Sequence, residues 1–249
     1  MGKIKWLGCI AMMLPSMAVA AERLYFNGEN WRAGYALVSA NAPERGGKYW
    51  VAVDVHGAGG LRNESLGAEL MRILEPEPVI VIVPSFKDGY QSGTGEFARQ
   101  LMENLKWVSQ RYPVHAKMFI HGHSGGAQFA HRFAFAHPEL VSGVSAHSAG
   151  TWATGDRFGQ INPRARRIPF LISCGEKDTQ KAFPESPMHR LEWYHAFAAE
   201  MKKQRFVIYA TTWPDRGHAV PMSLYAERLK ECFLLGNRGI KPVSDGWSR

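Results

Sequence analysis

Short runs of apolar, β-branched residues alternate along this chain with stretches whose apolar residues recur at helical spacing. Near-continuous apolar strands are typical of a parallel sheet that helices cover on both faces. Strand–helix alternation also implies right-handed crossovers between neighbouring strands. We therefore expect an α/β fold, with a doubly wound, mostly parallel sheet and helices on both faces. The expected strands are residues 51–55, 79–83, 118–121, 141–146, 170–174 and 206–209.

The expected helices are identified by their apolar stripes, which follow five of these strands. The stripes are Leu66, Leu70 and Ile73; Phe97, Leu101, Leu105 and Val108; Ala127, Ala130 and Ala134; Leu191, Tyr194, Phe197 and Met201; and Met222, Tyr225, Leu229 and Cys232. Two earlier runs, residues 24–26 and 35–38, have no helix between them, which favours an antiparallel pair at one edge of the sheet. Residues 147–168 are a loop or small cap, too short for a lid domain. We therefore expect one domain, residues 21–249, with no large lid domain.

The first 20 residues have the pattern of a signal peptide. Lys3 and Lys5 give a positive start, an apolar stretch from Trp6 to Met17 follows, and Ala18-Val19-Ala20 fits a cleavage site. An uncleaved anchor and a lipoprotein attached through Cys9 are the weaker alternatives. No later segment has 18 uninterrupted apolar residues, so no stable membrane insertion is expected. The sequence thus predicts an exported protein, periplasmic or secreted.

Charge and cysteine content narrow the class of protein further. The formal net charge is +8, but the basic residues are scattered apart from the run at 164–167. Nucleic acid is therefore not an expected partner of an exported chain of this kind. Cys174 and Cys232 remain after cleavage of the signal peptide, and export would permit a disulfide between them. Two buried free thiols are favoured, because both cysteines lie in apolar patterns.

The segment Gly122-His123-Ser124-Gly125-Gly126 joins an expected strand to an expected helix. A serine at the apex of a G-x-S-x-G turn in this setting is typical of a nucleophile elbow. Glycines are needed there because the turn is strained and leaves no room for side chains beside the serine. The pattern predicts that the Ser124 hydroxyl projects above the carboxyl end of the sheet.

Two further strand ends supply partners for such a serine. A serine hydroxyl is a weak nucleophile until a base removes its proton, and His218, after the last strand, can do this. A carboxylate on the far ring nitrogen would orient the imidazole and stabilise its charged form. Asp178, after residues 170–174, is the candidate, with Glu176 and Asp215 as alternatives. The sequence therefore predicts a Ser124–His218–Asp178 triad.

The loop His56-Gly57-Ala58-Gly59-Gly60 follows the strand at 51–55. A tetrahedral intermediate needs N–H donors directed at its oxyanion. The backbone N–H groups of Gly125 and Ala58 are the candidates, since glycines let this loop approach the substrate closely. His56 is expected to hold the loop by a hydrogen bond rather than to take part in catalysis.

At this point the chain resembles the α/β-hydrolase superfamily, in which the triad occurs in the order serine, acid, histidine. The resemblance covers residues 22–235. The H-G-x-G-G loop, the G-x-S-x-G-G turn and the lack of a large lid are similar to the exported esterase and polyhydroxybutyrate-depolymerase-like branch, which includes feruloyl esterases. The resemblance implies an α/β-hydrolase fold and hydrolysis of ester bonds.

A histidine pair and several loop aromatic residues bear on metal binding and substrate binding. His121 and His123 form an H-x-H pair, but no third ligand stands at a recognisable spacing, so no metal site is predicted. Aromatic residues in loops at the strand ends indicate an apolar or aromatic acyl site. The predicted substrate-binding residues are Phe86, Tyr90, Trp152 and Trp213, with Phe183 as a further loop aromatic.

Together these features predict an exported serine hydrolase that cleaves carboxylic esters through an acyl-enzyme, without a metal or organic cofactor. Its substrate is expected to be a small or polymeric ester, with short acyl groups preferred over long ones because the cleft should be open. A peptidase on the same fold and a non-catalytic binding protein on a hydrolase scaffold are the alternatives. The natural substrate and the oligomeric state stay open.

Overall fold

The computed structural model describes residues 20–248, apart from residues 27, 29, 63 and 156–158. Within this part of the chain, eight strands form one sheet in the order β1-β2-β4-β3-β5-β6-β7-β8. The strands are β1 (Ala20–Tyr25), β2 (Gly34–Ser39), β3 (Tyr49–Val55), β4 (Val79–Pro84), β5 (Val114–His123), β6 (Val141–His147), β7 (Phe170–Gly175) and β8 (Ile208–Trp213). The predicted α/β fold with a doubly wound sheet is confirmed.

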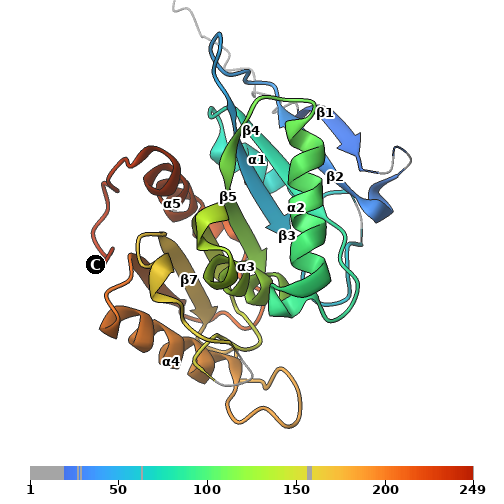
Figure 1. The fold of residues 1–249 in the computed structure, drawn as a ribbon. Coiled ribbons are helices and arrows are strands. Elements are labelled where there is room, and N and C mark those ends of the chain that lie inside the picture. The colour runs from blue at the N-terminus through green and yellow to red at the C-terminus, as the bar shows by residue number, and fades with distance from the viewer. Residues whose placement is uncertain (1–19, 27, 29, 63, 156–158, 249) are drawn as a thin grey trace, which may run out of the picture.

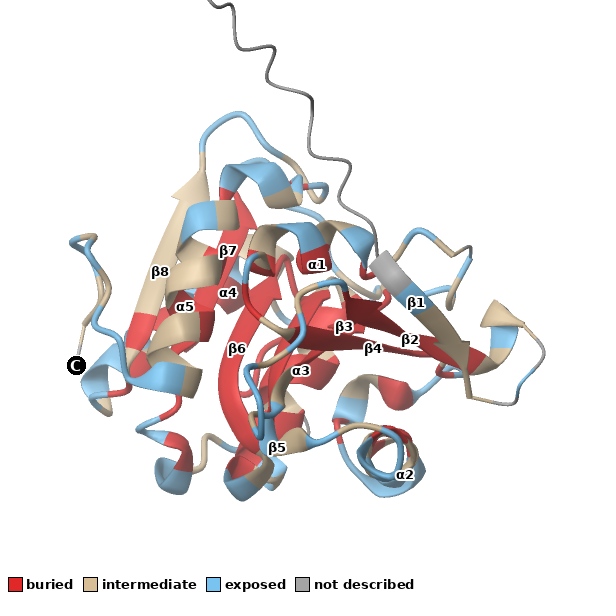
Figure 2. Ribbon diagram, turned by 90° about the horizontal axis from the view of Figure 1, so that it is seen from above, coloured by how far each residue is buried: buried red, intermediate tan, exposed pale blue. Residues whose placement is uncertain are grey.

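The sheet is parallel from β4 across to β8, and antiparallel where β1 meets β2 and where β2 meets β4. The antiparallel edge pair expected from the sequence is therefore present, with Tyr25 opposite Tyr35. Strands β3 to β7 are largely buried, as Figure 2 shows, because helices cover both faces of the sheet. Their near-continuous apolar composition follows from that double burial.

Five α-helices are described, and they divide into two groups on opposite faces. Helices α2 (Gly95–Ser109), α3 (Gly125–Ala136) and α4 (Arg190–Lys203) contribute to one hydrophobic core. Helices α1 (Ala68–Leu74) and α5 (Ala226–Arg238) contribute to the other. In Figure 1, α2 and α3 lie in front of the sheet and α1 lies behind it. Both cores therefore hold the carboxyl ends of the parallel strands in a fixed arrangement.

Some predicted elements are displaced by a few residues. The last strand was expected at 206–209, but β8 begins at Ile208 and runs to Trp213. Phe206 instead closes the end of α4, where its N–H bonds the Met201 carbonyl at 3.0 Å. The outer residues of β8 are half-buried because it is an edge strand, so its apolar signal is weak (Figure 2). Likewise Met222 lies in a 3₁₀ turn before α5 rather than on the helix.

Several other expectations concern the termini, the loops and the cysteines. The predicted signal peptide lies outside the described residues, except that Ala20 is the first residue of β1. The described residues of 147–168 contain a short 3₁₀ turn, Pro163–Ala165, and no lid domain. Among the described residues, no helix is both long enough and apolar enough to cross a membrane. Cys174 and Cys232 are buried free thiols, as favoured from the sequence.

Candidate active site

Ser124 occupies a strained turn between β5 and α3. Its φ of 56° and ψ of −117° are rarely adopted by a residue with a side chain. The flanking glycines are required, since a Cβ on Gly122 would lie 2.3 Å from the backbone of Gly126. A Cβ on Gly126 would lie 2.1 Å from the Val55 carbonyl oxygen. The turn thus tolerates no side chain at Gly122 or Gly126.

The structure brings the three predicted triad residues into one hydrogen-bonded chain. His218 Nε2 lies 2.9 Å from Ser124 Oγ, and His218 Nδ1 lies 2.8 Å from Asp178 Oδ2. An ionised carboxylate can only accept hydrogen bonds, so Nδ1 carries the proton and donates to Asp178. Nε2 is then free to accept the proton of the Ser124 hydroxyl, which is the arrangement that general-base catalysis requires.

Asp178 is held in place from several sides. Its side chain is 1% exposed, and Arg190 Nη1 approaches the second carboxylate oxygen, Oδ1, at 3.5 Å. The Asp178 backbone N–H bonds the Gly175 carbonyl, and its carbonyl accepts from Leu191 at the start of α4. Burial raises the pKa of the adjacent Cys174 thiol to about 12. Arg190 was not predicted to lie at this site, because no sequence pattern connects its position on α4 with the strand ends.

The two alternative acids point elsewhere. Glu176 accepts a hydrogen bond from Thr212 Oγ1 at 2.8 Å on the exposed surface. Asp215 is 84% exposed and pairs with Lys177 at 2.7 Å. Of the three carboxylates considered, therefore, only Asp178 has a hydrogen bond with the His218 ring.

The glycine-rich loop after β3 lies directly beside the nucleophile turn. The Ala58 backbone nitrogen is 3.0 Å from the position that a Cβ on Gly125 would take. The Tyr90 hydroxyl donates to the His56 carbonyl at 2.6 Å and holds the start of this loop. The two predicted oxyanion donors, the N–H groups of Ala58 and Gly125, are therefore neighbours next to Ser124.

His56 connects this loop to the next one, as predicted. The Phe86 N–H donates to His56 Nε2 at 3.0 Å, so the ring proton is on Nδ1, which donates to the Gly57 carbonyl at 2.8 Å. Burial lowers the pKa of His56, which favours this neutral ring. Both ring nitrogens are thus occupied in supporting the backbone.

His121 and His123 do not converge on a common point that could hold a metal. His121 Nδ1 lies 2.7 Å from Asp54 Oδ1, and this hydrogen bond is buried. His123 Nε2 donates to the His218 carbonyl at 2.7 Å. His123 therefore positions the backbone of the candidate base, a role that was not predicted from the sequence.

The predicted aromatic lining needs a correction. Phe86, Tyr90 and Trp152 are only 4%, 1% and 0% exposed, so their side chains do not line an open cleft. Phe86 packs on Phe129 of α3 with ring centroids 4.8 Å apart, and Trp152 stacks on Phe197 of α4 at the same distance. These loops fold down onto the helices because their aromatic side chains complete the core. Trp213, at the end of β8, is half-buried, as is Phe183.

A hollow of about 340 Å³ adjoins the predicted oxyanion loop. Leu61 and Leu66 contribute apolar surface to it, and Arg62 and Ser65 contribute polar groups. His56, Gly57, Ala58 and Gly60 form its remaining wall. No role at the site was predicted for these four residues. Leu66 was expected on the apolar stripe of the following helix, but α1 begins only at Ala68.

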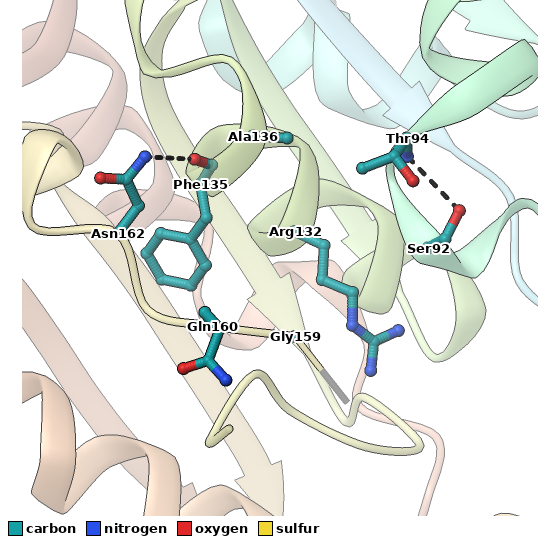
Figure 3. A pocket seen from close by; sticks show the side chains of 8 residues that line it. All are labelled: Ser92, Thr94, Arg132, Phe135, Ala136, Gly159, Gln160 and Asn162. Atoms are coloured by element: carbon teal, nitrogen blue, oxygen red, sulfur yellow. Dashed lines mark hydrogen bonds between the residues drawn. The ribbon is translucent and has the colours of Figure 1, made fainter. Parts of the chain in front are cut away.

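A second hollow, of about 360 Å³, lies against α3 and away from this site (Figure 3). Its lining consists of Arg132, Phe135 and Ala136 of α3 together with Ser92, Thr94, Gly159, Gln160 and Asn162. The Arg132 guanidinium donates to the Gln91 carbonyl and to Thr151 Oγ1, both at 2.7 Å. No residue of the Ser124–His218–Asp178 chain borders this hollow.

No protein-family model and no curated protein sequence matches this chain. Among solved structures, a poly(aspartic acid) hydrolase from a Sphingomonas species is 20% identical, with a TM-score of 0.59 over 79% of this chain and 92% of that one. A poly(3-hydroxybutyrate) depolymerase from Bordetella parapertussis is 19% identical, with a TM-score of 0.53 over 89% and 90%. The chain has the α/β-hydrolase fold. A ferulic acid esterase from Anaeromyces mucronatus, 15% identical, has a TM-score of 0.54 over 75% and 78%. In an α/β fold, the segments that follow the carboxyl ends of the parallel strands lie along the same side of the sheet. Ala58, Ser124, Asp178 and His218 lie in the segments that follow β3, β5, β7 and β8, respectively.

Proposed function

We propose that this protein is a serine hydrolase that cleaves carboxylic esters through an acyl-enzyme intermediate. The observation that carries the proposal is the continuous chain from Ser124 Oγ through the His218 ring to the buried Asp178 carboxylate. The similarity in fold to a poly(3-hydroxybutyrate) depolymerase and to a ferulic acid esterase favours ester substrates.

The proposed reaction follows from these positions. His218 Nε2 takes the Ser124 proton as Oγ attacks the ester carbonyl carbon, and the carbonyl oxygen becomes an oxyanion. The N–H groups of Ala58 and Gly125 stabilise that oxyanion, and each donor is worth about 3 kcal/mol to the transition state. The intermediate then expels the alcohol, which His218 protonates. Water activated by the same histidine hydrolyses the acyl-enzyme and restores Ser124.

The hollow beside Ala58 is the proposed site for one half of the ester. Its volume of about 340 Å³ and its two leucines suit a short acyl or alcohol group. A long alkyl chain would gain little, because each methylene adds about 0.8 kcal/mol only where it becomes buried. We therefore propose a preference for short or aromatic esters, with Trp213 as a further contact. Butyrate esters should have a higher kcat/KM than palmitate esters.

The proposal also includes export by the predicted signal peptide, residues 1–20, to the periplasm or the medium. N-terminal sequencing of the protein recovered from those fractions tests this directly. A mature chain that starts at Ala21 is the expected result. A protein that keeps its first residues and stays inside the cell would contradict it.

The activity itself is tested with a chromogenic butyrate ester and the Ser124→Ala variant. Hydrolysis should fall to the background rate in Ser124→Ala, while circular dichroism shows an unchanged fold, since alanine fits the same turn. The matched control is Ser109→Ala, an exposed serine at the end of α2. A folded Ser124→Ala variant with near wild-type activity would overturn the assignment. Peptide anilides tested in parallel distinguish an esterase from the alternative peptidase.

A further inference from the structure

A third hollow, of about 420 Å³, is lined mainly by arginines. Arg166 and Arg167 precede β7, Arg205 follows α4, and Val207 and Leu235 supply the apolar part of the lining. These residues lie near the amino ends of β7 and β8, whereas Ser124 and its partners follow the carboxyl ends of their strands. The hollow is thus at the opposite edge of the sheet from the candidate active site.

The three guanidinium groups have no carboxylate partner within the described residues. No ion pair there involves Arg166, Arg167 or Arg205, although eight other arginine or lysine side chains of the described chain pair with carboxylates. Glu200, on the last turn of α4, bonds Lys203 and Gln204 instead. All three arginines are exposed, so solvent screens much of the repulsion between their charges, and a bound anion would offset the rest.

The backbone of Arg205 is strained at this position. Its φ is 58°, in the left-handed region that glycine normally occupies after a helix. Its N–H bonds the Lys202 carbonyl at 2.9 Å, and the next N–H bonds Met201, which closes the helix end. An arginine costs stability here compared with glycine. Strained residues of this kind tend to be kept where their side chain has a function.

We propose that this hollow binds a phosphate group. Each guanidinium presents paired N–H donors that match phosphate oxygens, and three of them suit a multiply charged group better than a single carboxylate. Val207 and Leu235 provide apolar contact for whatever the phosphate is attached to. The ligand is therefore a phosphate ester with an apolar portion next to the phosphate, either a soluble compound or a lipid headgroup. This site is independent of the ester hydrolysis proposed above.

The test measures binding of inorganic pyrophosphate by calorimetry and of phosphatidylcholine vesicles with and without phosphatidic acid, a phosphate monoester, by sedimentation. Arg166→Gln and Arg205→Gln each remove one guanidinium. Each variant should bind the probes with an affinity roughly tenfold or more below that of the wild type. The single variants Arg72→Gln and Arg99→Gln each remove the same charge from an exposed surface pair elsewhere and should bind normally. Binding of pyrophosphate alone indicates a soluble ligand, and binding of the anionic vesicles as well indicates a headgroup.

Arg205→Gly separates binding from folding. Glycine relieves the backbone strain at this position, so the variant should have a Tm equal to or above that of the wild type while its affinity for pyrophosphate falls. Wild-type protein that binds neither pyrophosphate nor anionic vesicles would overturn the proposal. So would an unchanged affinity in Arg166→Gln and Arg205→Gly, or a strong preference for a DNA oligonucleotide over both probes.

Discussion

The choice of acid at the candidate site depends on the surroundings of single side chains. Asp178 is buried and bonds the His218 ring, whereas Asp215 is exposed and pairs with Lys177. Asp178→Asn should lower kcat by up to about 10⁴-fold, because an amide can stabilise the wrong histidine tautomer. Asp215→Asn should change kcat less than about twofold, since an exposed pair contributes little. Steady-state kinetics of the two variants against a butyrate ester gives the comparison, and the reverse ranking would move the acid to Asp215.

The sequence predicts which residues meet at this site better than it predicts what surrounds them. Ser124, Asp178 and His218 follow the ends of parallel strands, and such ends lie along one edge of a sheet, so their meeting follows from topology. The burial of Phe86 and Trp152 could not be deduced, because a loop aromatic can turn either toward solvent or onto the helix below. That choice depends on space between elements, which a sequence pattern does not contain.

The nucleophile turn is an element whose geometry leaves no spare volume. A Cβ on Gly126 would lie 2.1 Å from the Val55 carbonyl oxygen and 2.8 Å from that of His56, both backbone atoms that cannot move aside. Gly126→Ala should therefore lower the free energy of unfolding by about 3 kcal/mol or more. Gly57→Ala is the control, since its Cβ would meet no atom closer than 3.8 Å. Urea unfolding gives the free energy of unfolding of both variants. Equal values for Gly126→Ala and Gly57→Ala would contradict this account of the turn.

Tyr90 supports the oxyanion loop from the neighbouring segment. Its buried hydroxyl donates to the His56 carbonyl at 2.6 Å, which fixes the start of the loop that carries Ala58. Tyr90→Phe should lower kcat roughly tenfold with a smaller change in KM, because the loop acts on the transition state more than on the bound ester. It should also cost about 1 kcal/mol of stability. Tyr112→Phe, which removes an exposed hydroxyl bonded to Glu22, is the control. Equal kcat values for the two variants would remove Tyr90 from this positioning role.

Helix and strand boundaries show where local patterns stop being sufficient. The apolar stripe from Met222 to Cys232 has helical spacing throughout, yet α5 begins only at Ala226. Pro221 and the 3₁₀ turn that follows it precede the helix, while Met222 still packs against the same core. Packing onto a common face gives the same spacing signal whether or not the backbone is continuous.

The molecule as a whole contains buried histidines that make its stability depend on pH. His131 is fully buried, donates from Nδ1 to the Ala127 carbonyl at 2.7 Å and accepts the Ala153 N–H at Nε2. Burial lowers its pKa well below the usual value, so the unfolded chain takes up a proton that the folded chain does not. The free energy of unfolding is therefore highest above about pH 6.5 and falls as the pH drops below it, by up to about 1.4 kcal/mol per pH unit for each such histidine.

Urea unfolding of the wild type and of His131→Gln between neutral and mildly acid pH tests this contribution. The variant should lose less stability per pH unit than the wild type, whatever its stability at neutral pH. His147, which is also fully buried with a lowered pKa, should leave a residual dependence in the variant. Identical slopes for the two proteins would show that His131 does not titrate on unfolding.

The overall topology was only partly accessible from the chain. Strand–helix alternation predicts a doubly wound sheet, but it does not order the strands, and β4 lies between β2 and β3 although it follows β3 in sequence. That order depends on which side each crossover takes, and the alternation of strands and helices does not specify it. The two cores on opposite faces, by contrast, follow directly from strands that are apolar along their whole length.

The central claim is that Ser124 is the nucleophile of an ester hydrolase. The most direct measurement is mass spectrometry of the protein after reaction with a fluorophosphonate, which forms a stable bond only with an activated serine. We predict one adduct per chain, on the peptide that contains Ser124, with loss of butyrate ester hydrolysis in proportion to labelling. Ser124→Ala should remain unlabelled. A folded wild-type protein that takes up no label, or an adduct on any other serine, would contradict the account.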